Sequence, residues 1–240
     1  MIYNSSMNLT SYSHFIGKYN KSIRDLWKTE FKNAINTSNN SKVIFTQPCF
    51  HVTQGESPVW FLGMNPSLPK SPKKIISQNS NLTKNLMYEL SQEQKHMHKE
   101  HQYFKAAKKF FNDDVGIAEL VNPIFHDLYP IRHTQQKEFE KFLNQNSSLC
   151  DSLDEATKKL ITGVMPNLII IANAGASKRI QKLFQPKFDT NSTKLTFEAN
   201  GKKTDMIFSS MLSGQRALDT YSRSRLAKEI RENWSSRNNK

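Results

Sequence analysis

Residues 60–70 read W-F-L-G-M-N-P-S-L-P-K, and the change of character inside this stretch decides the fold. Residues 58–62 form a continuous apolar run, which is typical of a central parallel strand that is buried on both faces. The run gives way abruptly to Gly63, Asn65 and Pro66. A buried strand that ends in this way places a polar side chain at the open end of a sheet, so Asn65 is the first candidate for chemistry. Such residues also build ordinary turns, so the motif needs support from the rest of the chain.

The same succession of strand, tight loop and helix occurs again later. Residues 166–172 read P-N-L-I-I-I-A and predict a second buried strand, which is followed by Asn-Ala-Gly and a helix over residues 176–184. A hairpin is expected over residues 193–208, with its turn at Asn200-Gly201, a dipeptide favoured in type I′ turns. Apolar residues at helical spacing predict the remaining helices, over residues 11–35, 103–111, 138–144, 154–162 and 216–234.

Alternating strands and helices of this kind predict an α/β fold, a three-layer sandwich with a central, mainly parallel sheet. The 240 residues suit a single domain spanning residues 1–240, in which residues 1–41 form an N-terminal helix and polar loop and residues 42–234 form the core. Parallel sheets bind ligands beyond the carboxyl ends of their strands. Four polar loops follow predicted strands, at residues 63–67, 127–132, 173–175 and 209–216. We expect these loops to meet at one edge of the sheet.

The charge of the chain indicates its partner. There are 34 Lys and Arg against 21 Asp and Glu, a net charge of +13, which favours a polyanion and above all a nucleic acid. Lys- and Asn-rich sequences also follow from AT-rich coding DNA, so charge alone does not decide the matter. No apolar run is long enough to span a membrane and no secretory signal is evident, which predicts a cytoplasmic protein. Cys49 and Cys150 fit neither a disulfide framework nor a metal site.

Two motifs resemble the uracil-DNA glycosylase superfamily. They are G-M-N-P-S at residues 63–67 and S-S-M-L-S-G-Q-R-A-L-D at residues 209–219, with D-L-Y-P-I-R at 127–132 and L-I-I-I-A-N-A at 168–174 between them in the expected order. The first motif is similar to the G-x-N-P form of the mismatch-specific and single-strand-selective branches. The resemblance implies the fold of that superfamily and a monomeric, monofunctional DNA glycosylase that needs no cofactor. Its partner would be single- or double-stranded DNA.

The resemblance also implies roles for particular residues. Asn65 would position or activate the attacking water. The pocket for the base would be formed by residues around it and at the ends of other strands, namely Gly63, Met64, Pro66, Ser67, Asp127, Tyr129 and Asn173. The late loop would hold phosphate and enter the DNA helix after the base has left. The DNA-binding residues of this loop would be Ser209, Ser210, Ser213, Gln215 and Arg216. Independently of the resemblance, Lys70 can contact backbone phosphate or be a solvated loop charge.

This sequence departs from the superfamily in three places. The late loop lacks the histidine that several branches carry, and no aromatic residue closely follows the first motif, so Tyr88, Tyr103 or Tyr129 would have to stack on the base. Asp127 stands where uracil-specific members carry an amide. A carboxylate accepts hydrogen bonds, so it suits the exocyclic amine of cytosine better than the O4 carbonyl of uracil. This predicts a cytosine-derived or otherwise modified base, and some superfamily members are thought to act against phage DNA that carries such bases.

Each of these assignments has a structural alternative. Asp127 can pair with Arg132 or cap a loop, Asn173 can cap the following helix, and the serines of residues 209–213 can simply form a turn. A Schiff-base role for a lysine such as Lys70 is disfavoured, because no apolar setting would lower its pKa. The whole chain can also be a catalytically inactive binder of DNA or of a modified base, since fold does not dictate activity. A small-molecule nucleoside hydrolase is disfavoured by the charge and by the lack of an Asp-rich metal motif.

Overall fold

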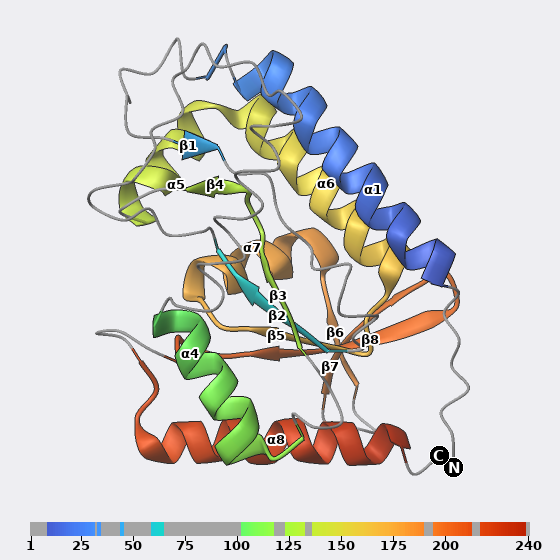
Figure 1. Cartoon of the computed structure of the whole chain (residues 1–240), viewed down its shortest axis with the longest axis vertical. Helices are drawn as coiled ribbons and strands as arrows, with labels where there is room; N and C mark the ends of the chain where they lie inside the picture. Colours follow the sequence, from blue (N-terminus) through green and yellow to red (C-terminus); the bar gives the residue numbers. More distant parts are fainter. Residues whose placement is uncertain are drawn as a thin grey trace. The chain divides into compact units, whose positions relative to one another are not determined.

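The computed structural model of the chain describes residues 9–31, 33–34, 44–45, 59–64, 102–117, 123–132, 136–189, 194–212 and 217–238 (Figure 1). The chain falls into two units, each built from several segments. We call the first the helix unit, made of Met1–Val52, Met64–Glu93 and Asp127–Val164. We call the second the sheet unit, made of Thr53–Gly63, Gln94–His126 and Met165–Lys240.

The sheet unit is built around a six-stranded sheet with strand order β3-β2-β5-β8-β7-β6. Its strands are β2 (Val59–Gly63), β3 (Ile124–Asp127, of which the last residue belongs to the helix unit), β5 (Leu168–Ile171), β6 (Lys187–Asp189), β7 (Lys194–Ala199) and β8 (Lys202–Phe208). Strand β5 is parallel to both β2 and β8, whereas β7 is antiparallel to both β8 and β6. The expected α/β class is confirmed, and the sheet is mixed.

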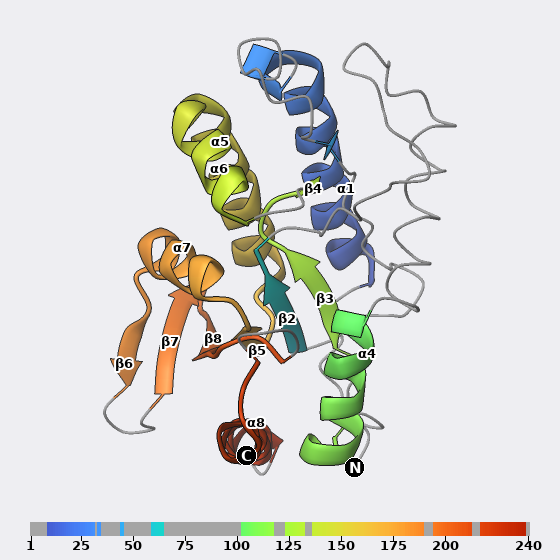
Figure 2. The ribbon, with the colours of Figure 1, turned by 90° about the vertical axis from the view of Figure 1, so that its left-hand side faces the viewer.

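Helices lie on both faces of this sheet. They are α4 (Gln102–Lys109), which continues as the π-helical turn η3 (Phe110–Val115), α7 (Ala174–Phe184) and α8 (Thr220–Asn238). Figure 2 shows α7 on one side of the sheet and α4 and α8 on the other. The side of α4 and α8 is closed by one apolar cluster, to which β2 contributes Val59 and Phe61, and in which Phe61 meets Phe111 edge to face.

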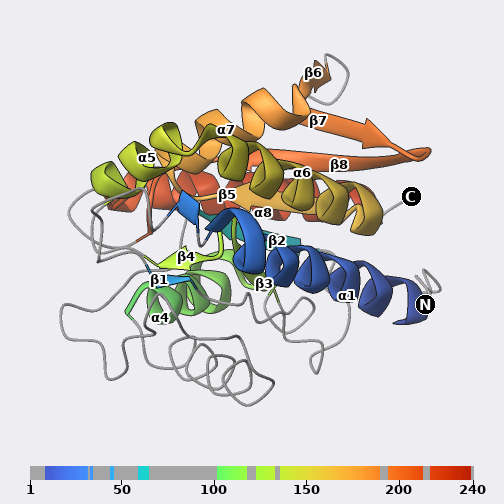
Figure 3. The same cartoon turned by 90° about the horizontal axis from the view of Figure 1, so that it is seen from above.

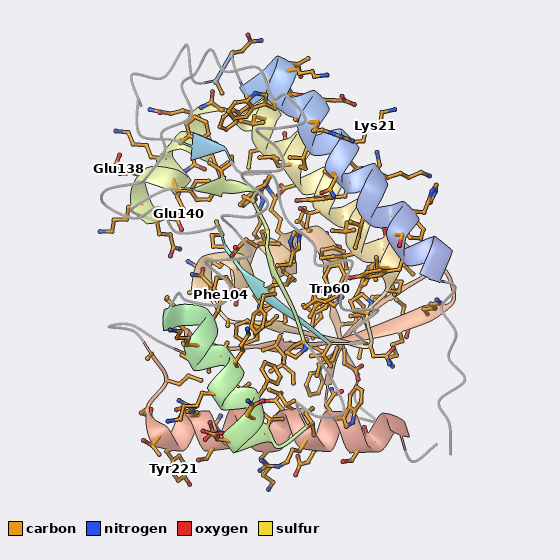
Figure 4. All side chains as sticks on the ribbon, viewed as in Figure 1. Lys21, Trp60, Phe104, Glu138, Glu140 and Tyr221 are labelled. Atoms are coloured by element: carbon orange, nitrogen blue, oxygen red, sulfur yellow. The ribbon has the colours of Figure 1, made fainter. Side chains whose placement is uncertain are left out.

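Alternation along the strands supplies side chains to both faces of the sheet. Trp60, labelled in Figure 4, is fully buried. It is not part of the Phe61 cluster and meets His126 edge to face. The hairpin of β7 and β8 turns where the sequence predicted. Asn200 and Gly201 have φ angles of 52° and 70°, and a type I′ turn requires positive φ at both positions.

The helix unit is built on two long antiparallel helices. They are α1 (Leu9–Leu26), extended by the π-helical turn η1 (Trp27–Phe31), and α6 (Ser147–Val164), which lie side by side (Figures 1 and 3). Glu30 at one end accepts hydrogen bonds from the hydroxyls of Ser148 and Ser152, while Phe15 lies against Gly163 at the other end. Lys21 points outward from α1 (Figure 4). The unit is completed by α5 (Gln136–Gln145) and the short antiparallel pair of β1 (Ile44–Phe45) and β4 (Ile131–Arg132).

The helix-forming residues that the sequence singled out are mostly core residues. Phe104, Ala107, Phe110 and Phe111 are buried, as the helical spacing of residues 103–111 predicted. Within the part of the chain that the structure describes, no helix combines the length and apolar character that crossing a bilayer requires.

Candidate functional site

Three of the four loops singled out in the sequence leave the sheet at the same edge. Leu62 is paired with Ile171, and Ile171 with Phe208, so the carboxyl ends of β2, β5 and β8 are level. The ladder continues one residue further, where the Ala172 N–H donates to the Leu62 carbonyl at 3.0 Å and the Ser209 N–H donates to the Ile171 carbonyl at 2.8 Å. The segments that follow Gly63, Ile171 and Phe208 therefore start beside one another.

The strand order makes this edge a suitable place for a ligand. The chain passes from β2 to β3 on one side of β2 and later returns to form β5 on the other side. Such a reversal separates the loops above neighbouring strands, and α/β sheets bind ligands in the crevice that results. The ends of β2 and β8 are two strands apart, which corresponds to about 10 Å at ordinary strand spacing.

Asn173 caps the helix that follows β5. It is the N-cap of α7, and its Oδ1 accepts hydrogen bonds from the N–H groups of Gly175 at 2.8 Å and Ala176 at 3.1 Å. These two bonds satisfy amides that have no partner within the helix. Of the two roles that the sequence left open for Asn173, the structure therefore gives it the capping role.

The late loop is described only in part. Ser209 is half-buried and its amide is already bonded to the sheet, while Ser210 is exposed. The Leu218 N–H donates to the Met211 carbonyl at 2.9 Å, so the two ends of the segment between them are held together. Ser213, Gln215 and Arg216 lie outside the described residues. Asp219 then starts α8, since its Oδ1 accepts from the Ser222 N–H at 2.8 Å.

The first motif and the D-L-Y-P-I-R motif meet within the helix unit. The N–H of Tyr129 donates to the carbonyl of Met64 at 3.1 Å, although 65 positions separate the two residues in the sequence. Met64 follows Gly63, the last residue of β2, and precedes Asn65. Asn65, Pro66, Ser67 and Lys70 themselves lie outside the described residues.

Tyr129 is a core residue of the helix unit. It is 1% exposed, its ring packs against Phe139, and its hydroxyl donates to Oδ1 of Asp154 at 2.7 Å. The sulfur of Cys150 lies 3.9 Å from the same hydroxyl. The ring therefore has no open face on which a base could stack in this conformation. The side chains of Tyr88 and Tyr103, the other two tyrosines considered for stacking, lie outside those that the structure describes.

Asp127 is the described residue with the most unusual chemistry. It ends β3 and is partly exposed as a residue, yet burial of its carboxyl group raises its pKa to about 7. Burial raises the pKa of the nearby Tyr19 well above its usual range. The Thr157 side chain lowers the pKa of Tyr19, and the charge of Asp127 raises it. Among the described side chains none pairs with Asp127 as a cation, and the side chain of Arg132, its predicted partner, lies outside them. Asp127 can therefore be protonated or ionised near neutral pH.

Neither the protein-family models nor the curated proteins match this chain. Its chemistry must be argued from the site itself. Within the described ranges, His, Cys, Asp and Glu side chains do not gather in any group of three that could hold a metal ion. The polar side chains that follow β5 and β8 are the Asn173 amide and the Ser209 hydroxyl, which bind by hydrogen bonds. In the helix unit, the Asp127 carboxyl group can bind in the same way.

A groove elsewhere on the helix unit is less suited to a polyanion. It encloses about 500 Å³ between α1 and α6 and is lined by the carboxylates of Asp25, Asp151 and Glu155 and by the ammonium group of Lys159. Lys159 is paired with Glu155 at 3.3 Å, so the lining is acidic overall. None of the residues singled out in the sequence lines this groove.

Sequence reasoning did not connect the D-L-Y segment with three polar residues of the helices beside it, namely Tyr19, Asp154 and Thr157. Each is buried, and each lies on a helix whose apolar periodicity drew attention to other residues. Asp154 and Thr157 are three residues apart and so share the buried face of α6. A polar residue at a buried position of an amphipathic helix was the available signal, because such a group needs a partner.

Proposed function

We propose that this protein is a DNA glycosylase of the uracil-DNA glycosylase type. It would hydrolyse the bond between a pyrimidine base and its sugar in DNA and leave an abasic site. The observation that carries the proposal is the shared edge at the ends of β2, β5 and β8, because the two motifs that resemble the superfamily begin there, at Gly63 and at Ser209. The proposal includes a monomeric enzyme in the cytoplasm, with a sandwich of the superfamily's type.

The reaction needs positioned groups rather than a strong nucleophile in the protein. An extruded base costs a few kcal/mol in lost stacking and pairing, which a pocket must offset. Cleavage leaves positive charge on the sugar and negative charge on the base, so aligned hydrogen-bond donors and a positioned water lower the barrier. Asn65 would orient that water through its carbonyl oxygen, because a neutral amide has no useful basicity. The net charge of +13 supports binding to the phosphate backbone.

Asp127 would read the base. Its ionised form accepts a hydrogen bond from the exocyclic amine of cytosine, whereas its protonated form can donate to the O4 carbonyl of uracil or thymine. With a pKa of about 7, both forms are present near neutral pH. Excision of a cytosine-derived base would therefore be favoured above pH 7. Excision of uracil would become faster below pH 7. A role in defence against phage with modified DNA is consistent with the first preference.

The decisive experiment is a panel of single- and double-stranded DNAs that carry uracil, thymine mismatches or modified cytosines. Purified protein should produce alkali-labile sites in at least one of them, and Asn65→Ala should abolish the product while DNA binding remains. Asn144→Ala, at an exposed position of α5, is the matched control and should keep full activity. Replacing Asp127 by Asn should change the preference between uracil and modified cytosine, and an unchanged preference would remove its role in reading the base.

A second candidate is a catalytically inactive binder of DNA or of a modified base. The burial of Tyr129 favours it, because the ring of this tyrosine, one of the three considered for stacking on an extruded base, is enclosed in the core. Binding to the panel without any product would establish this function and exclude the first.

A further inference from the structure

The D-L-Y segment is held in place by two polar side chains of α6. The Thr157 hydroxyl donates to the carbonyl of Leu128 at 3.0 Å, and Asp154 accepts the hydroxyl of Tyr129 at 2.7 Å. We propose that Asp154 and Thr157 are positioning residues for the base-excision reaction, because they orient the segment that carries Asp127 and supports Met64. The inference rests on the proposed function.

The contact with Thr157 sets the direction of the backbone next to Asp127. Leu128 and Thr157 are both 1% exposed, so water cannot replace the bond between them. Thr157 also lies close enough to Tyr19 to lower the pKa of its hydroxyl group, whereas the charge of Asp127 raises that pKa. The hydroxyl of Thr157 thus lies beside the backbone that follows Asp127. It also lies beside a group that interacts with the side chain of Asp127. Its loss would allow the carboxyl group to move relative to a bound base.

The contact with Asp154 acts one residue further on. The Tyr129 ring spans from the backbone of the segment to α6, and its hydroxyl is anchored to the carboxyl group of Asp154. The N–H of the same tyrosine donates to the Met64 carbonyl at 3.1 Å. The chain of contacts therefore runs from α6 through Tyr129 to the residue immediately before Asn65.

Apolar side chains could fill the same space, but they could not select one orientation. An isosteric valine at position 157 would leave the Leu128 carbonyl buried without its donor, and the segment could then shift to find another. Reacting groups must be held within a few tenths of an ångström, and a misplacement of about 1 Å can cost about 100-fold in rate. The two polar contacts therefore matter for the rate of reaction rather than for the tightness of DNA binding.

The test is single-turnover excision by Thr157→Val of the DNA that the wild-type protein cleaves best. We expect the rate constant to fall about 10- to 100-fold, while the dissociation constant for DNA changes less than about threefold. Thr157→Ser keeps the hydroxyl and should recover the rate to within about threefold of wild type. Tyr129→Phe, which removes the hydroxyl and with it the bond to Asp154, is the second variant and should lose rate in the same way.

Thr162→Val is the matched control on the same helix, because the Thr162 hydroxyl bonds to the carbonyls of Lys158 and Lys159 within α6. It should excise at the wild-type rate. Unchanged rates in Thr157→Val and Tyr129→Phe, measured on folded protein, would overturn the inference while leaving the proposed function intact. Equal losses in Thr157→Val and Thr162→Val would overturn it as well. A wild-type protein that excises no base would overturn the proposed function and, with it, this inference.

Discussion

Strand β2 and helix α6 are both buried, but they are buried in different ways. All five residues of β2 are buried and all are apolar or glycine. Helix α6 buries nine residues, and Asp154 and Thr157 are two of them. The strand needs only its backbone ladder and apolar contacts on two faces. The helix also carries side chains that must find particular hydrogen-bond partners in the D-L-Y segment.

This difference means that β2 serves as scaffold, whereas α6 positions another segment of the chain. Apolar burial is non-directional, so β2 is held firmly by many contacts without depending on any single geometry. A buried hydrogen bond is directional, and its loss exposes a polar group to an apolar environment. The sheet unit and the helix unit should therefore respond differently to substitution, and three measurements test this difference.

The largest effect on stability should come from truncating a buried side chain of β2. Phe61 is 1% exposed and meets Phe111 and Phe125 edge to face, so Phe61→Ala should lower the free energy of unfolding by about 3–5 kcal/mol. Chemical denaturation followed by circular dichroism measures the change. Phe188→Ala is the matched control, because Phe188 is 61% exposed and its loss should change stability by less than about 0.5 kcal/mol. Equal effects of the two substitutions would mean that β2 is not the core strand described here.

The next effect concerns two neighbours on β3 that belong to different units. Burial lowers the pKa of His126 to about 3 and raises that of Asp127 to about 7. Between pH 3 and 6.5 the unfolded chain binds the proton of His126 more readily, so this histidine costs stability as pH falls. Between pH 4 and 7 the folded chain holds the proton of Asp127 more readily, so this aspartate costs stability as pH rises. From pH 4 to 6.5 the two effects oppose each other.

Substituting each residue should uncover the effect of the other. In Asp127→Asn the free energy of unfolding should rise from pH 4 to 6.5, and in His126→Gln it should fall from pH 4 to 7. Each change should amount to roughly 2–3 kcal/mol over the range, since one pKa unit corresponds to about 1.4 kcal/mol and solvent screens the partly exposed Asp127. Urea unfolding at each pH measures the slopes. Slopes of the same sign in the two variants would contradict the opposed burial of these residues.

The smallest effect tests the packing of α1 on α6. An added Cβ at Gly163 would overlap Cδ1 of Phe15, whereas an added Cβ at Gly17 on α1 would meet nothing within 4 Å. Gly17→Ala should therefore stabilise by about 0.5–1 kcal/mol, the ordinary gain of alanine over glycine in a helix. Gly163→Ala should instead destabilise by about 1–2 kcal/mol, because the Phe15 ring must move. Thermal unfolding measures both.

The double variant Phe15→Ala with Gly163→Ala completes this test. Once the ring is absent, the alanine at position 163 should no longer be costly relative to Phe15→Ala alone. If Gly163→Ala stabilises the wild-type chain as Gly17→Ala does, the two helices do not pack at this point.

The sequence by itself determined the elements whose signals are local. Apolar runs of strand length predicted β2 and β5, helical spacing predicted the buried face of α4 and η3, and Asn200-Gly201 predicted the tight turn between β7 and β8. These features depend on burial and on backbone preferences of neighbouring residues, so a short window contains the information. The α/β class follows from their order along the chain.

Only the tertiary structure decided which polar groups meet. From the sequence, Tyr129 is an aromatic ring that could stack on a base. In the fold it is buried and forms hydrogen bonds with both Met64 and Asp154. Asp127 acquired its raised pKa because its surroundings exclude water, whereas the cap formed by Asn173 is local and was one of the two roles that the sequence offered. The partners of Tyr129, at Met64 and Asp154, come from distant parts of the chain. A directional bond between distant segments exists only once packing has brought them together, so no local pattern could have predicted it.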